Sequence, residues 1–219
     1  MAGEKLMKRK ELECYLQDLD GFTKPKILLE QYETRPHIAA CMLHTIESSF
    51  QDLKGKVVLD LGCGCAALGI GSALLGASYV LGVDIDDDAL QSALLNVEQF
   101  EISNMDFIQC DVKDLPRVLN RKEVDTVIMN PPFGTKRNKG LDSLFVETAL
   151  ECLKDNGVLY SLHKSSTRDH FLRKAPSWKV DAKVLAQLRY DLPATYKFHN
   201  KNSVDIEVDF WRFEKKCKI

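Results

Sequence analysis

Residues 57–67 read Val-Val-Leu-Asp-Leu-Gly-Cys-Gly-Cys-Ala-Ala, an apolar strand that runs into a glycine turn and then into an apolar helix. Gly62 and Gly64 let a ligand approach the backbone closely, and the start of the following helix favours polar groups of that ligand. About twenty residues later, a second apolar run at 79–83 ends in Asp84. A carboxylate at the end of a second strand is placed to bind the hydroxyls of a ribose. The stretch therefore predicts a nucleoside site on a parallel α/β sheet.

A nicotinamide or flavin dinucleotide is the obvious competitor for such a site. The dinucleotide fingerprint spaces its glycines G-x-G-x-x-G. Here the next glycine after Gly64 is Gly69, so the loop fits a pyrophosphate poorly. Asp60, just before the loop, would repel phosphates, yet it suits an amino group or a sulfonium ion. These residues favour a nucleoside over a dinucleotide.

Residues 124–133, Val-Asp-Thr-Val-Ile-Met-Asn-Pro-Pro-Phe, form a second informative stretch. A conjugated amine is a poor nucleophile because its lone pair is delocalised, and two acceptors aimed at its N–H bonds relieve this. The side-chain oxygen of Asn130 and the carbonyl of Pro131 could fill those positions, since Pro132 restricts the backbone before it. Phe133 offers a face on which a planar group can stack. A strand followed by a Pro-Pro turn and a core phenylalanine explains the same residues, and this stretch alone favours neither interpretation.

Together the two stretches resemble the class I S-adenosylmethionine-dependent methyltransferases. These enzymes hold the cofactor with an Asp-x-Gly-x-Gly loop, an acidic residue after the second strand and an aspartate after the third. The third match is Cys110-Asp111-Val112, after the expected strand at 105–108. The resemblance implies that Asp111 accepts a hydrogen bond from the adenine amine of the cofactor and that Val112 lies beside the ring. Asn-Pro-Pro-Phe narrows the group to amino methyltransferases, whose targets are adenine in nucleic acid or glutamine in protein.

Longer blocks at 30–36, 129–136, 160–168 and 189–208 resemble the methyltransferase-like protein 5 family over nearly the whole chain. These eukaryotic enzymes methylate the exocyclic amine (N6) of one adenine in 18S ribosomal RNA. The resemblance implies S-adenosylmethionine as cofactor, a small zinc-binding activator subunit as heterodimer partner, and a nuclear, nucleolar or cytoplasmic location. Ala66-Ala67 departs from the family, where glycine and a larger apolar residue are expected. The cofactor residues implied are Gln31, Thr34, Asp60, Gly62, Gly64, Cys65, Ala67, Asp84, Asp111 and Val112.

The expected fold is a Rossmann-like α/β methyltransferase fold. Strands and helices alternate up to about residue 165, which predicts a parallel sheet, and two long strands at 180–190 and 204–213 predict an antiparallel hairpin at one edge. By analogy the sheet has seven strands in the order 3-2-1-4-5-7-6, with helices on both faces. We expect a single domain over 1–219, in which 1–50 is a helical extension that covers the cofactor site. Thr34 with Pro36 is typical of an N-cap followed by an early helical proline.

Charge is unevenly distributed along the 219 residues, whose net charge is −2. Residues 51–130 carry 6 basic against 13 acidic side chains, and residues 154–219 carry 14 against 8. The chain as a whole is therefore not a general nucleic-acid binder, but its C-terminal part is basic. For any one lysine an ordinary solvated surface is the simpler interpretation, except in the loop 134–140 directly after the Asn-Pro-Pro-Phe motif. The candidate RNA contacts are Lys136, Arg137, Lys139, Lys164, Tyr196 and Lys197.

The cysteines and the hydropathy of the chain indicate the cellular compartment in which the protein is expected. Seven cysteines without a C-x-x-C pair fit a reducing compartment, and Cys63-x-Cys65 lacks the second ligand pair of a metal site, so we expect no metal. The start of the chain shows no secretory signal. The uncharged run at 61–83 contains six glycines and a Gly-Ala-Ser turn, so it is not a membrane-spanning helix.

The third strand lies at an edge of the sheet in the expected order. Its apolar side chains Met105, Phe107, Ile108 and Cys110 point to both faces. An apolar edge strand invites strand addition by another chain, so we expect the partner subunit to bind there.

The function expected is methyl transfer to an unpaired adenine that leaves its stack, because unstacking costs a few kcal/mol and stacking on Phe133 returns roughly 1 to 3. No general base is required, since the amine becomes more acidic once methylated. Two alternatives stay open: a glutamine methyltransferase acting on protein, and a non-catalytic cofactor-binding scaffold subunit. The intact residues Asn130, Pro131, Pro132 and Phe133 argue against the scaffold.

Overall fold

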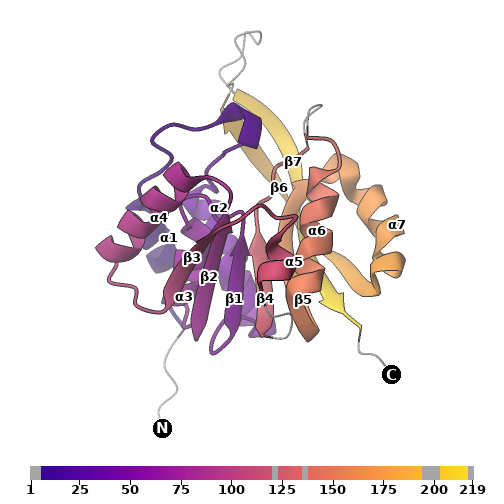
Figure 1. Ribbon diagram of the computed structural model, residues 1–219, viewed down its shortest axis with the longest axis horizontal. Coiled ribbons are helices and arrows are strands. Elements are labelled where there is room, and N and C mark those ends of the chain that lie inside the picture. The colour runs from indigo at the N-terminus through magenta and orange to yellow at the C-terminus, as the bar shows by residue number, and fades with distance from the viewer. Residues whose placement is uncertain (1–5, 120–122, 135–137, 194–202, 217–219) are drawn as a thin grey trace.

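The computed structural model describes residues 6–119, 123–134, 138–193 and 203–216, and it contains a seven-stranded sheet in the order β3-β2-β1-β4-β5-β7-β6. Neighbouring strands are parallel from β3 to β5, and β7 is antiparallel to both β5 and β6. The predicted fold, including the closing hairpin, is confirmed (Figure 1). The strands are β1 Val57–Leu61, β2 Tyr79–Asp84, β3 Met105–Gln109, β4 Val124–Met129, β5 Leu153–Lys164, β6 Val180–Pro193 and β7 Ser203–Lys215.

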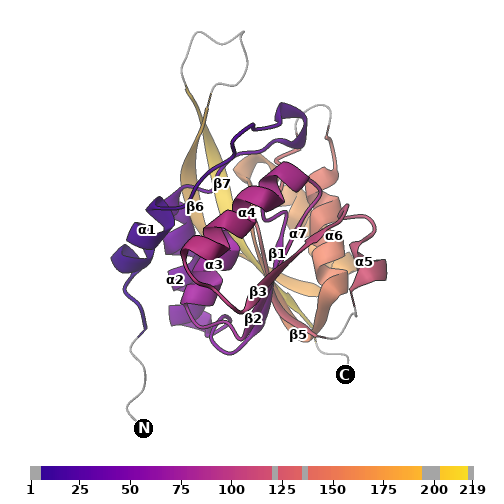
Figure 2. The ribbon, with the colours of Figure 1, turned by 60° about the vertical axis from the view of Figure 1, so that its left-hand side comes forward.

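Helices cover both faces of this sheet (Figures 1 and 2). Alternate residues of a strand point to opposite faces, so Val58 and Leu59 enter two different cores. The first core contains side chains of α1 to α4, and the second contains side chains of α5 to α7. The helices are α1 Arg9–Gln17, α2 Pro36–Phe50, α3 Ala67–Leu74, α4 Asp87–Gln99, α5 Leu115–Val118, α6 Leu141–Cys152 and α7 Arg168–Trp178, with short 3-10 turns η1 Ile27–Leu29 and η2 Ser165–Thr167.

One helix start differs from the prediction. Helix α2 begins at Pro36 with Arg35 as its N-cap, and no side chain caps it. Thr34 is therefore not the cap, because its hydroxyl is used elsewhere, as described below. No helix among the described residues is long and apolar enough to cross a membrane.

The segment between α1 and α2, residues 18–35, is called the N-terminal segment below. It crosses the same end of the sheet as the loops that follow β1, β2, β3 and β4. Figure 2 shows this indigo segment, with its single turn η1, above β1, β2 and β3. Parallel α/β sheets bind ligands at the carboxyl ends of their strands. The fold thus encloses a cavity between those loops and the N-terminal segment.

Candidate active site

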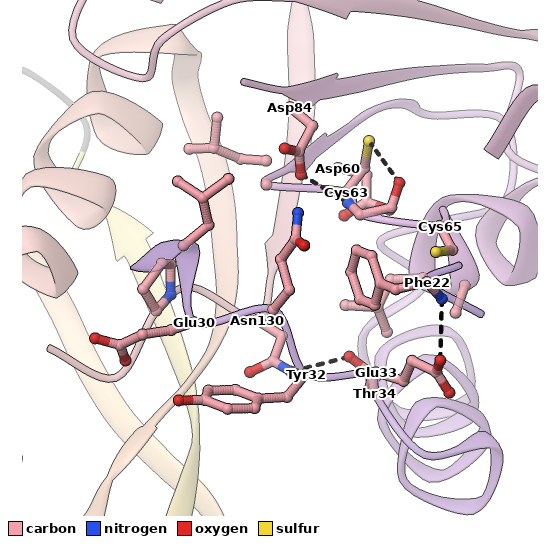
Figure 3. A pocket seen from close by; sticks show the side chains of 18 of the residues that line it. Phe22, Glu30, Tyr32, Glu33, Thr34, Asp60, Cys63, Cys65, Asp84 and Asn130 are labelled. Atoms are coloured by element: carbon pink, nitrogen blue, oxygen red, sulfur yellow. Dashed lines mark hydrogen bonds between the residues drawn. The ribbon is translucent and has the colours of Figure 1, made fainter. Parts of the chain in front are cut away.

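A cavity of about 360 Å³ opens at the carboxyl ends of β1 to β4. Its volume lies in the range of small-molecule sites. Residues of the N-terminal segment form one wall, among them Phe22, Tyr32 and Glu33 (Figure 3). All ten residues that the sequence suggested for cofactor binding line it: Gln31, Thr34, Asp60, Gly62, Gly64, Cys65, Ala67, Asp84, Asp111 and Val112.

The glycine loop after β1 is tightly constrained. Gly62 and Gly64 have φ angles of +73° and +53°, in the left-handed region that favours glycine. A Cβ atom on Gly64 would lie 2.8 Å from the ring of Phe22, so the N-terminal segment packs directly on the loop. Ala66, where the resemblance to the family leads us to expect glycine, adopts a φ of +69°. An alanine in this left-handed conformation puts mild backbone strain at the turn into α3, on the order of 1 kcal/mol.

Asp60 lies beneath this loop and is 1% exposed. Its Oδ2 accepts a hydrogen bond from the backbone N–H of Gly69, near the start of α3, at 2.7 Å. Burial, and to a lesser extent the charge of Asp84, raise the pKa of Asp60 to about 7. A cationic group in the cavity would favour the charged form of this carboxyl group.

Asp84 is the last residue of β2, and both of its carboxylate oxygens accept hydrogen bonds. Oδ2 accepts from the N–H of Gly64 at 2.8 Å and Oδ1 accepts from the N–H of Asp86 at 2.9 Å. Burial raises the pKa of Asp84, although these backbone bonds oppose the shift. Asp111, after β3, accepts from the N–H of Lys113 at 3.0 Å, and Val112 beside it is buried. The two carboxylates thus face the cavity from different strands with fixed orientations.

Asn130 at the end of β4 is held by its amide nitrogen. Nδ2 donates to the hydroxyl oxygen of Thr34 at 3.0 Å and to that of Tyr190 at 3.2 Å. Figure 3 shows Asn130 and Thr34 joined in this way beside Tyr32. The side-chain oxygen Oδ1 is buried and has no hydrogen-bond partner among the described residues. A buried acceptor without a partner costs stability, so its presence calls for an explanation, and a ligand N–H would supply one.

Residues 39–175 match the family described as the methyltransferase small domain. The chain belongs to this methyltransferase family. It is 58% identical to rRNA N(6)-adenosine-methyltransferase METTL5 of Danio rerio, over 94% of this chain and 99% of that protein. The Drosophila melanogaster protein of the corresponding name is 52% identical over 95% and 97%. The resemblance to the methyltransferase-like protein 5 family is thereby confirmed.

A solved structure supports the same fold for this methyltransferase. The crystal structure of a candidate RNA methyltransferase from Pyrococcus horikoshii is 33% identical, covers 96% of this chain and 98% of its own, and gives a TM-score of 0.81.

The residues of the Asn-Pro-Pro-Phe motif differ in their access to the cavity of this methyltransferase. Asn130 and Pro132 line the cavity, whereas Pro131 and Phe133 are not among its described lining residues. Phe133 is 4% exposed, with the ring of Tyr32 stacked at 6.3 Å and that of Tyr190 edge-on at 5.9 Å. Stacking of a base on the face of Phe133 that Tyr32 covers therefore requires the ring of Tyr32 to move.

Only part of the expected RNA surface lies in the described residues. Lys139 is exposed on the loop before α6, and Lys164 is partly exposed at the end of β5. The other four candidate contacts, Lys136, Arg137, Tyr196 and Lys197, lie outside the described residues.

Sequence reasoning missed how the N-terminal segment is anchored. Lys26 forms ion pairs with Asp86 and, at 2.7 Å, with Asp88, and Gln31 donates to Asp86 at 2.6 Å. Hydrogen bonds to Asp86 and Asp88 raise the pKa of Lys26 to about 12. The three acids at the start of α4 suit the helix dipole, and that local explanation concealed their second role.

A second anchor lies on the buried face of the same helix. Asn96 accepts from the N–H of Asp20 at 2.8 Å and donates to the carbonyls of Asp20 and Cys65. It joins the N-terminal segment to the glycine loop.

Cys65 of the glycine loop belongs to no candidate metal site among the described residues. Burial raises the pKa of Cys65 to about 12, so the thiol stays neutral. The part of the chain that the structure describes contains no group of three or more His, Cys, Asp or Glu side chains that could hold a metal ion.

Proposed function

We propose that this methyltransferase transfers a methyl group from S-adenosylmethionine to N6 of one adenine in 18S ribosomal RNA. The observation that carries the proposal is the buried, unpaired Oδ1 of Asn130 at the edge of the cavity. An exocyclic amine supplies the N–H donor that this oxygen lacks. Relatives that align with nearly the whole chain are named for rRNA N(6)-adenosine methylation.

The residues of the cavity fit the cofactor. When bound, S-adenosylmethionine supplies an electrophilic methyl group on a cationic sulfur. Asp84, Asp111 and Val112 line the cavity, which supports a role for the Asp84 carboxylate at the ribose hydroxyls and for Asp111 with Val112 at the adenine. The negative charge of Asp60 favours a cationic ligand at the loop. Residues in the range 16–34 line the cavity from the N-terminal side, which supports the proposal that the extension at 1–50 covers the cofactor site.

Asn130 acts by position and electrostatics. Its oxygen, together with the carbonyl of Pro131, accepts the two N–H bonds of the amine, which turns the nitrogen lone pair toward the methyl group. These acceptors become more important as positive charge develops on the nitrogen. The proton is then lost to water, so no side chain has to act as a general base.

A partner subunit belongs to the same proposal. Strand β3 is at the edge of the sheet, and beside it α4 exposes Leu94 and Leu95 by 49% and 61%. An apolar edge strand flanked by exposed leucines suits strand addition by a small zinc-binding activator subunit. A nuclear, nucleolar or cytoplasmic location would give the complex access to ribosomal RNA.

The Asn130→Ala variant tests the proposed function. It removes the acceptor but leaves Gly62, Asp84 and Asp111 in place, so cofactor affinity by calorimetry should stay within about twofold of wild type. Methyl transfer from tritiated cofactor to 18S RNA should fall about a hundredfold to a thousandfold. The matched control is Asn104→Ala, which removes a partly buried amide bonded to the Ala77 carbonyl, away from the cavity.

Two results would refute the proposal. An Asn130→Ala enzyme with wild-type transfer would show that the oxygen does not act on the amine. Wild-type protein that methylates glutamine in a protein extract but leaves 18S RNA untouched would assign the pocket to an amide instead.

A further inference from the structure

Tyr190 bonds to two residues that are distant from it in the sequence: Glu33 of the N-terminal segment and Asn130 of the Asn-Pro-Pro-Phe motif. It lies on β6, is 1% exposed, and its ring contacts the edge of Phe133. Its hydroxyl donates to the backbone carbonyl of Glu33 at 2.9 Å and accepts from Nδ2 of Asn130 at 3.2 Å. Burial raises the pKa of Tyr190, so the hydroxyl keeps its proton.

The direction of this chain of hydrogen bonds is fixed by chemistry. The carbonyl of Glu33 can only accept, so the single hydroxyl hydrogen of Tyr190 points to it. The tyrosine oxygen can then only accept from Asn130, which requires the amide NH2 on that side. A flipped amide would place Oδ1 against an oxygen that has no hydrogen to give. Tyr190 therefore determines which end of the Asn130 amide is the NH2 group held on its side and leaves Oδ1 as the acceptor without a partner among the described residues.

Thr34 reinforces the same orientation from the N-terminal segment, since its oxygen accepts the other N–H of the amide. Glu33, the neighbour of Thr34, accepts the N–H of Phe22 on its side chain, and Phe22 packs against Gly64 of the cofactor loop. The orientation of Asn130 thus depends on the N-terminal segment being seated over the cofactor cavity.

We infer that Tyr190 is a positioning residue for methyl transfer: its hydroxyl, held by the Glu33 carbonyl, keeps the Asn130 oxygen turned toward the amine of the target base. The inference rests on the proposed function of Asn130. The described residues that line the cavity do not include Tyr190. Tyr190 therefore acts through Asn130 and not on the cofactor.

The variant Tyr190→Phe removes the hydroxyl and keeps the ring against Phe133. Because the variant loses one of the two neutral hydrogen bonds that hold the amide, kcat should fall about tenfold. KM for RNA and Kd for S-adenosylmethionine should stay within about twofold of wild type. Tyr160→Phe is the matched control: Tyr160 is fully buried and its hydroxyl bonds to Asp52 at 2.6 Å and Arg212 at 3.0 Å, none of which lines the cavity. This control should lower Tm and leave kcat unchanged.

A double-mutant cycle separates positioning from a structural role. In the Asn130→Ala background, measured by single-turnover transfer of tritiated methyl groups, adding Tyr190→Phe should change the rate less than about twofold. Thr34→Val provides an independent variant should Tyr190→Phe fold poorly, because it removes the other acceptor while the tyrosine stays, and kcat should again fall.

The outcomes are distinct. A Tyr190→Phe enzyme with wild-type kcat, or an equal loss in the Asn130→Ala background, overturns the inference and leaves the proposed function intact. If Asn130→Ala is itself fully active, the proposed function fails and the inference fails with it.

Discussion

Two aspartates, the buried Asp60 and the partly buried Asp84, line the cavity in different hydrogen-bonding environments. Asp60 has one backbone partner, the N–H of Gly69, whereas Asp84 accepts from Gly64 and Asp86. Burial raises the pKa of both carboxyl groups, to about 7 for Asp60. The charge of Asp60 therefore changes close to neutral pH, where the enzyme meets its cofactor.

Cofactor affinity should depend on pH through Asp60. A cationic ligand binds the charged carboxylate best, so protonation of Asp60 as pH falls below 7 weakens binding. Affinity for S-adenosylmethionine should rise about fivefold between pH 6 and 7. Asp60→Asn keeps an acceptor for Gly69 but cannot ionise, so its calorimetric profile should be flat. Adenosine, which lacks the cationic part, serves as the ligand control; an unchanged slope in Asp60→Asn would contradict this assignment.

Removing the Asp84 carboxylate should affect binding more than chemistry. Asp84→Ala deletes the expected ribose acceptor and releases the N–H of Gly64 that shapes the loop. A hydrogen bond to a charged group contributes roughly 1.5 to 3 kcal/mol, so cofactor affinity should fall about tenfold to a hundredfold. Calorimetry measures the loss, and kcat at saturating cofactor is the internal control. Wild-type affinity would show that the carboxylate does not contact the cofactor.

At the scale of elements, the N-terminal segment is fastened to α4 by Lys26 and Gln31 at Asp86. Lys26→Met keeps the aliphatic stem and removes the ion pairs, which should loosen the wall of the cavity. Dissociation of the cofactor, followed by stopped-flow fluorescence, should accelerate about threefold. Lys24→Met, two positions earlier and exposed, should leave the rate unchanged. Equal rates in both variants would mean that the segment is held by its other contacts.

The exposed edge β3 gives a prediction about the partner. Phe107→Lys and Ile108→Lys place charges on both faces of this strand, and burying them against a partner would be unfavourable. Copurification of the proposed zinc-binding subunit should be lost. Leu172→Lys is the control, because Leu172 is 46% exposed on α7. Retention of the subunit at wild-type levels by both β3 variants would exclude this edge as the interface.

The sequence predicted single elements better than it predicted their mutual contacts. The alternation of apolar runs with glycine turns predicts a parallel sheet, whereas the order of its strands is implied by the resemblance to the methyltransferases. Local motifs identify Asn130 and Gly62. Tyr190 was not identified as a site residue, because it lies 60 positions from Asn130 and hydropathy indicates only that it is buried. The prediction that Thr34 caps helix α2 was wrong for the same reason. Its N-cap pattern is local, while its hydroxyl accepts a hydrogen bond from Asn130, 96 positions away.

The whole molecule places most ionisable side chains at its surface, and His163 is an exception. It is 1% exposed on β5, and neither ring nitrogen has a hydrogen-bond partner among the described residues. Phe171 lies 4.2 Å away between ring centroids. Burial lowers the pKa of His163 to about 3, although the nearby Asp209 opposes the shift. The native protein therefore contains a neutral histidine under conditions in which the unfolded chain would bind a proton.

This difference predicts lower stability in mild acid. The folded pKa of about 3 lies below the unfolded value near 6.5, so the unfolded state binds more protons between these values and stability falls as pH decreases through that window. Between pH 7.5 and 5 the loss from His163 amounts to about 2 kcal/mol. Asp60, with its raised pKa, acts in the opposite direction, so the test is made in the Asp60→Asn background. Urea unfolding at the two pH values should show the loss with His163 present and little of it in His163→Leu, because leucine has no proton to bind. An equal loss in both proteins would mean that other groups determine the acid sensitivity of the fold.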